Sequence, residues 1–91
     1  MFKKLREIVS KESQEILEYN GFIIVPILQK EKGSYITNGV IKKTIDGDIK
    51  KNSFLRTDTF TKKDDLIECV HRKGRIIIDE YGDDLFEKDW L

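Results

Sequence analysis

Residues 22–57, FIIVPILQKEKGSYITNGVIKKTIDGDIKKNSFLRT, decide the fold of this chain. The stretch contains runs rich in β-branched residues, which favour strands. Short turn signals separate the runs, and Asp46-Gly47 is the strongest of them, because both residue types accept the positive φ angles of a tight hairpin. The pattern predicts an antiparallel meander of three strands, over residues 22–28, 35–45 and 49–57. Pro26 cannot donate to a sheet ladder, so the first strand is expected at an edge of the sheet or bulged at this residue.

Helical patterns flank the predicted strands. Apolar residues recur near helical spacing over residues 2–19, which predicts a charged N-terminal helix that Asn20-Gly21 ends. A second, amphipathic helix is expected between Thr61, as its N-cap, and Gly82, as its C-cap. Its apolar stripe includes Gly74, which indicates close approach to a strand, near Gly39. The prediction is an α+β fold of order α-β-β-β-α, with a three-stranded antiparallel meander and a long C-terminal helix packed on one face.

Length and composition limit the possible functions. The chain has 91 residues, with 17 Lys and Arg balanced by 17 Asp and Glu. This length fits a single domain, in which residues 1–20 form the charged helix and residues 21–91 the α+β part, and it excludes a Rossmann domain or a TIM barrel. One cysteine excludes an intramolecular disulfide, and the apolar runs are too short to cross a bilayer. We therefore expect a cytoplasmic protein without membrane contact.

The neutral total hides an asymmetric distribution of charge. Residues 30–75 carry 12 basic and 7 acidic side chains, whereas residues 79–89 carry six carboxylates. The basic residues include four hairpin lysines, Lys42, Lys43, Lys50 and Lys51, and a pair at the start of the second helix, Lys62 and Lys63. The predicted α-β-β-β-α order is also that of double-stranded RNA-binding domains. Those domains place lysines at the start of the last helix, where they contact phosphates, and Lys62 and Lys63 have a similar position here. An alternative is that lysines on edge strands guard against aggregation. Zero net charge excludes only nucleic-acid binding through bulk positive charge.

No set of catalytic or metal-binding residues is evident. Cys69 and His71 are two residues apart on the predicted helix, so they face different directions and cannot form a dyad or a metal pair. We expect Cys69 to be a small buried side chain, His71 to be solvated, and the acidic residues 79–89 to form a solvated helix end. The aromatics Tyr35, Phe54 and Phe60 are expected in the core, with base stacking as the alternative. No enzyme activity, metal, cofactor or small-molecule substrate is expected.

Arg56 and Asp58 form the most distinctive polar cluster of the strands. They share a parity on the third predicted strand and therefore project on the same side of it. We expect Asp58 or Thr59 to cap the second helix, and Arg56 to pair with Asp58 or with the acidic segment. The alternative is that the cluster binds a partner or an anion. Trp90 either folds back on the second helix or provides an exposed anchor for an interface.

Several segments between Tyr19 and Phe86 resemble the HlyU family, small bacterial proteins labelled transcriptional activators. The most specific are Arg56-Thr57-Asp58-Thr59 and Ile78-Asp79-Glu80-Tyr81-Gly82, and the supporting ones are residues 19–22, 39–41, 46–47, 54–55, 72–73 and 85–86. The chain departs from the family at Gly74, where members more often carry Ala. The resemblance implies a role in the regulation of genes.

Together these features predict a non-enzymatic regulatory or binding protein that acts through a macromolecular partner, either another protein or a second copy of the chain. The first alternative is direct binding of nucleic acid through the basic hairpin, and the second is a phage-type inhibitor of a host nucleic-acid machine. The candidate partner-binding residues are Arg56, Asp58, Lys42, Lys43, Lys50, Lys51, Lys62, Lys63 and Trp90.

Overall fold

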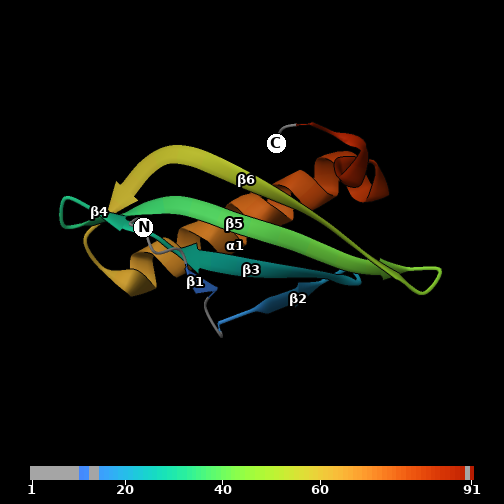
Figure 1. Ribbon diagram of the computed structural model, residues 1–91, viewed down its shortest axis with the longest axis horizontal. Helices are drawn as coiled ribbons and strands as arrows, with labels where there is room; N and C mark the ends of the chain where they lie inside the picture. Colours follow the sequence, from blue (N-terminus) through green and yellow to red (C-terminus); the bar gives the residue numbers. More distant parts are fainter. Residues whose placement is uncertain (1–10, 13–14, 90) are drawn as a thin grey trace, which may run out of the picture.

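The computed structural model describes residues 11–12, 15–89 and 91 of the chain. Within them, six strands form one antiparallel sheet. The strands are β1 (Lys11–Glu12), β2 (Leu17–Tyr19), β3 (Phe22–Leu28), β4 (Lys30–Glu31), β5 (Ser34–Ile45) and β6 (Asp48–Phe60). The helix α1 (Lys63–Tyr81) and the short 3-10 helix η1 (Gly82–Glu87) follow. In Figure 1, α1 crosses behind β3, β5 and β6, so the described residues form two layers, and none of their helices lies on the other face of the sheet.

Two-residue turns join the strands of the meander. The β5–β6 turn is Asp46-Gly47, with φ angles of 53° and 83° that place both residues in the conformation of a type I′ turn. Lys32-Gly33 forms the corresponding turn between β4 and β5. Strand β4 extends β3 in the same register along β5, with the Ile36 amide donating to the Gln29 oxygen at 2.9 Å between them. The predicted antiparallel meander is therefore confirmed.

The predicted N-terminal helix is wrong over the part that the structure describes. Residues 11–12 and 17–19 form β1 and β2, which both pair with β3, and residues 1–10, 13 and 14 lie outside the described residues. Half-buried Leu17 and Tyr19 alternate with exposed Glu18, which is the period of a strand. Asn20-Gly21 is a hairpin turn of the same kind as Asp46-Gly47 and not a helix end.

The position of Pro26 follows from these additional strands. Because β1 and β2 pair with one side of β3 and β5 with the other, β3 is an interior strand and the predicted edge position is wrong. Strand β2 pairs with residues 22–24 and β1 with residues 27–28, so Pro26 lies between the two ladders. The register set by the hairpin turns directs the Pro26 nitrogen to this interrupted side, where its missing proton breaks no ladder bond.

The core lies between α1 and the central strands. Its buried members are Phe22, Ile24, Ile41, Phe54, Leu66, Val70, Ile77, Ile78 and Leu85. Gly74 makes the predicted close approach to a strand, but its neighbour is Ile24 of β3, whereas Gly39 lies against Val70 and Phe54. The Gly82 C-cap is confirmed. The Thr61 N-cap is wrong, because α1 begins after Lys62 without a side-chain cap.

Candidate partner-binding surface

The side chains that point away from α1 form a surface that we call the open face. Alternation along the strands places it opposite the core, since Ile24, Ile41 and Phe54 point toward α1. It consists of Ile23, Val25 and Ile27 of β3, Asn38, Val40 and Lys42 of β5, and Ile49, Lys51, Ser53 and Leu55 of β6. Val25 and Ile27 are buried, so the β3 side of this face is shielded from solvent. The β6 side is not shielded.

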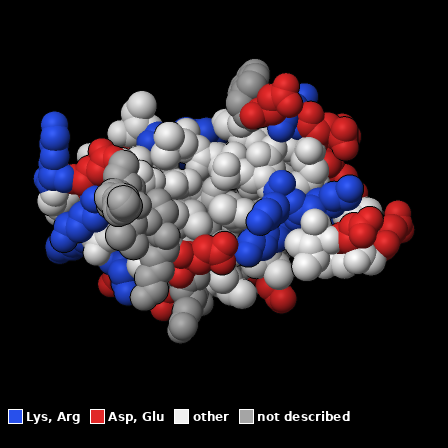
Figure 2. Space-filling model, in the orientation of Figure 1, with Lys and Arg blue, Asp and Glu red and all other residues white. Residues whose placement is uncertain are grey.

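Two aliphatic side chains stand exposed on the β6 side of the open face. Ile49 is 72% and Leu55 62% exposed. Figure 2 shows this face of the molecule, on which uncharged side chains fill the middle and a group of Lys and Arg atoms lies toward the β5–β6 turn. Neither Ile49 nor Leu55 is among the candidate residues predicted from the sequence. The inward position of Phe54 could have identified them, because residues of odd number in this strand must then face outward.

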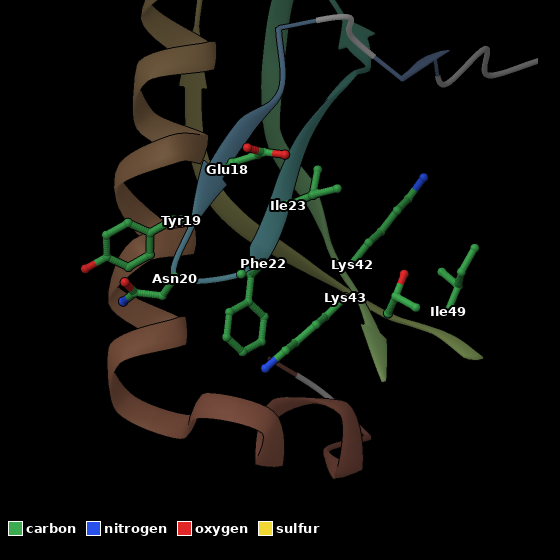
Figure 3. A pocket seen from close by; sticks show the side chains of 10 residues that line it. Glu18, Tyr19, Asn20, Phe22, Ile23, Lys42, Lys43 and Ile49 are labelled. Atoms are coloured by element: carbon green, nitrogen blue, oxygen red, sulfur yellow. The ribbon is translucent and has the colours of Figure 1, made fainter. Parts of the chain in front are cut away.

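The hairpin lysines do not form a single patch. Lys42 lies opposite Lys51, and Lys43 opposite Lys50, in adjacent pairs of the β5–β6 ladder. Adjacent residues of a strand project to opposite faces, so Lys42 and Lys51 lie on the open face and the other two on the helix side. Figure 3 shows Lys42 and Lys43 pointing in opposite directions. Each face of the hairpin therefore has two of the four charges.

On each face of the hairpin, one lysine forms an ion pair with a carboxylate of the same chain. The Lys42 Nζ lies 3.4 Å from a Glu12 carboxylate oxygen, and the Lys43 Nζ lies 2.7 Å from Asp83 Oδ1. Lys43 also stands over the Phe22 ring, 4.5 Å from its centroid. In the described part of the chain, Lys50 and Lys51 are exposed and have no ion pair. These two lysines carry the positive charge that the hairpin offers to a partner.

Lys62 and Lys63 lie at the other end of the molecule from the hairpin turn, where α1 begins (Figure 1). Strand β6 continues for nine residues beyond Lys51. At the rise of a β-strand, these residues span a distance of about 30 Å. Asp64 and Asp65 follow the two lysines in the first turn of α1. The structure thus does not bring together the two groups of lysines that prompted the comparison with RNA-binding domains.

Arg56 and Asp58 lie in a β-bulge. The β5–β6 register shifts between Ile36 and Asn38, so that three residues of β6 lie opposite Thr37. Buried Thr37 donates from its hydroxyl to the Asp58 main-chain oxygen at 2.8 Å. The Asp58 carboxylate lies 3.4 Å from Lys73 Nζ of α1, and Arg56 donates to the Leu91 oxygen at 2.7 Å. The predicted helix cap by Asp58 and its pairing with Arg56 are therefore wrong: the bulge directs both residues to other partners.

Asn52, like Arg56, forms hydrogen bonds with the C-terminal segment. It is not among the candidate residues predicted from the sequence. Its side-chain nitrogen donates to the main-chain oxygens of Leu85 and Lys88, at 2.8 and 2.9 Å. With Arg56, this residue fastens residues 85–91, which we call the C-terminal strap, to β6. Leu85, the first residue of the strap, is fully buried in the core. Trp90 lies outside the described residues.

The remaining polar candidates do not converge on a chemical site. Cys69 is buried, as expected, whereas half-buried His71 contacts the Glu15 main-chain oxygen through Nε2 at 2.8 Å and is not simply solvated. The Tyr19 hydroxyl donates to the Asp79 carboxylate at 2.9 Å, and this bond raises the pKa of Tyr19 above its ordinary value, with a smaller contribution from burial. Among the described residues, no group of His, Cys, Asp and Glu side chains is arranged to hold a metal ion.

The structure places the aromatic candidates in the core. Phe54 is buried, and Tyr35 and Phe60 pack against the core cluster, so none of them provides a base-stacking platform on the open face. One hollow, of about 590 Å³, lies where the β5–β6 hairpin extends beyond the β2–β3 turn (Figure 3). Its lining has no histidine or cysteine and consists of Glu18, Tyr19, Asn20, Gly21, Phe22, Ile23, Lys42, Lys43, Thr44 and Ile49. Among the described residues, no helix has the length and the apolar character needed to span a bilayer.

Comparison with known proteins identifies one match. A family model described as transcriptional activator HlyU matches residues 1–86 of the chain. No curated protein and no solved structure matches it.

Proposed function

The chain belongs to the HlyU family, and on this premise we propose that it is a non-enzymatic regulator of transcription that binds a partner protein through the β6 side of its open face. The family description indicates regulation of transcription and leaves the mechanism open. The observation that carries the proposal is the exposure of Ile49 and Leu55 on the sheet face that no helix covers among the described residues. Ile49 and Leu55 lie at the two ends of one strand face, with exposed Lys51 and Ser53 between them, so a partner that contacts both aliphatic side chains would cover this whole side of the sheet.

The charges around these residues support a protein partner over a nucleic acid. The open face provides one lysine without an ion pair among the described residues, Lys51, beside two exposed aliphatic side chains. Binding to phosphates gains from several convergent cations, and the structure separates the lysines between two faces and two ends of the molecule. Aliphatic contacts with a single cation are better matched by a protein surface that combines apolar and acidic side chains.

Complementation of a strain that lacks the gene tests the proposal. Leu55→Glu places a charge on the proposed surface, and Ile76→Glu is the matched control, because Ile76 is 56% exposed on α1, in the other layer. We expect Ile76→Glu to restore the transcript profile of the wild type and Leu55→Glu to fail, with both variants folded by circular dichroism. If Leu55→Glu restores the profile, the open face is not the functional surface.

A mobility-shift assay provides the outcome that would replace a protein partner with a nucleic acid. Duplex DNA, duplex RNA and single strands are tested at about 50 mM salt, where phosphate contacts are strong. We expect no shift. A shift that Lys50→Glu together with Lys51→Glu abolishes would assign the function to the basic hairpin instead.

A further inference from the structure

The outer edge of β6 is a second feature of the same side of the sheet. Strand β6 pairs with β5 and, among the described residues, with no other strand. In a hairpin closed by a two-residue turn, the pair next to the turn, here Ile45 and Asp48, is hydrogen-bonded, and bonded and non-bonded pairs then alternate. The main-chain groups of residues 49, 51, 53 and 55 therefore point away from β5, toward solvent.

Two side-chain contacts agree with this orientation. The Ser53 amide donates to the side-chain oxygen of Asn52 at 2.8 Å, and the Leu55 oxygen accepts from Arg56 Nη1 at 3.0 Å. Both groups are thus directed to the edge and are not used in the ladder with β5. An edge strand is a template on which an extended segment of another chain can add a strand, and here the added strand would replace the side-chain contacts of Asn52 and Arg56 at Ser53 and Leu55.

The side chains of these four residues lie on the open face. Ile49 and Leu55, at the two ends of the edge, are the exposed aliphatic residues, and Lys51 stands between them. Lys51 has no ion pair in the described part of the chain, whereas its cross-strand neighbour Lys42 contacts Glu12. A strand added at this edge would place alternate side chains directly opposite Ile49, Lys51 and Leu55.

We propose that the edge of β6 between residues 49 and 55 binds an extended, antiparallel segment of the partner protein, which has aliphatic residues opposite Leu55 and Ile49 and a carboxylate opposite Lys51. Read from its N-terminus, the segment has an aliphatic residue, three further residues, an acidic residue, one further residue and a second aliphatic residue. The proposal rests on the proposed function, because it takes the partner to be a protein.

A second copy of the chain fits this edge less well. Antiparallel pairing of two β6 edges about Asn52 would place each Lys51 opposite Ser53 of the other copy and diagonally across from the other Lys51, so neither lysine would face a carboxylate. It would also place both copies of η1, with Asp83 and Asp84, in the same layer. The complementary charge therefore comes from a different chain.

Titration of the full ¹⁵N-labelled chain with a short peptide tests the proposal by NMR. The probe is acetyl-Val-Thr-Thr-Ser-Glu-Ser-Val-amide, at concentrations up to about 1 mM, because single short strands bind weakly. We expect saturable shift changes in the amides of residues 49–55. The absence of such changes at the highest concentration would overturn the proposal.

Two sets of variants establish how the peptide binds. Ser53→Pro removes an outward amide without removing a ladder bond, and should weaken binding at least about tenfold, whereas Ser53→Ala retains the amide and should bind as the wild type does. Lys51→Glu should weaken binding of the probe, and a probe with Lys in place of Glu should restore it. Equal binding by Ser53→Pro and Ser53→Ala would show that the edge is not used.

The outcomes separate this proposal from the proposed function. If the peptide does not bind but Leu55→Glu still fails in complementation, the open face functions without strand addition, and only the present proposal falls. Sedimentation of the free chain provides the other comparison. A dimer that Ser53→Pro dissociates would assign the edge to a second copy and would also overturn the proposal.

Discussion

Replacement of Gly74 by Ala tests whether α1 lies on β3 as closely as described. A Cβ atom at this position would lie 2.8 Å from both Cδ1 and Cγ2 of Ile24 and 3.0 Å from its Cγ1. These atoms belong to a fully buried, β-branched side chain that cannot easily rotate away. Ala gains about 1 kcal/mol over Gly in a helix interior, whereas overpacking of a core costs about 1–3 kcal/mol. We therefore expect Gly74→Ala to lower the free energy of unfolding by about 0–2 kcal/mol.

A double-mutant cycle isolates the contact itself. Ile24→Val removes Cδ1, one of the two nearest atoms, and by itself should cost about 0.5–1.5 kcal/mol. In the Ile24→Val background, the same Gly74→Ala change should be more favourable by at least about 0.5 kcal/mol, since the steric conflict is partly removed. Urea unfolding with linear extrapolation measures all four free energies.

A second pair of variants measures the difference in helix propensity between Gly and Ala within α1. Glu68 is exposed on α1, so the difference between Glu68→Gly and Glu68→Ala gives the propensity term without a core contact. If Gly74→Ala stabilises the protein by this full amount and shows no coupling to Ile24→Val, the helix is not seated on Ile24, and the description of the core is wrong.

Three further substitutions test other contacts. Thr37→Val removes the donor to the Asp58 main-chain oxygen and should cost about 1–3 kcal/mol in urea unfolding; no loss would contradict the role of the buried hydroxyl. Asn52→Ala frees two main-chain oxygens of the C-terminal strap, and amide exchange in the strap should rise at least about tenfold with the meander unchanged. Tyr19→Phe removes the hydrogen bond to Asp79 and should lower the Tm at pH 7. Because the bond raises the pKa of Tyr19 from 10.0, its stabilisation is complete below pH 10.0 and is lost at higher pH, where the Tm difference should disappear.

The hairpin turns explain which part of the fold was predictable. Asp46-Gly47 is flanked by strand-like sequence on both sides, so its residue types were sufficient to predict the turn. Asn20-Gly21 has the same signature, but residues of this type also end helices, and the apolar spacing over residues 2–19 fitted a helix. The alternation of Leu17, Glu18 and Tyr19 was the only local signal for a strand, and three residues are too few to decide between the two periods.

The contacts of the charged residues were less predictable, because they depend on tertiary structure. Lys43 and Asp83 are 40 positions apart in the sequence, and only the packing of η1 beside the hairpin brings them within 2.7 Å. The prediction of a basic sheet and a separate acidic C-terminal segment is consistent with composition, but the two charged regions contact each other. This contact, with that between Lys42 and Glu12, reduces the free charge of the hairpin to Lys50 and Lys51.

The bulge at residues 56–58 limits the part of β6 to which the proposed strand addition applies. Its three residues opposite Thr37 could not be read from the sequence, because a two-residue insertion leaves Phe54 and Phe60 on the same face and the alternation unchanged. Arg56 and Asp58 lie in one of the two segments that most resemble the family, and they contact the strap and α1. A bulge also twists the edge of a strand and interrupts regular pairing. The proposed strand addition is therefore confined to the regular half of β6 between the turn and the bulge, which is the half that exposes Ile49, Lys51 and Leu55.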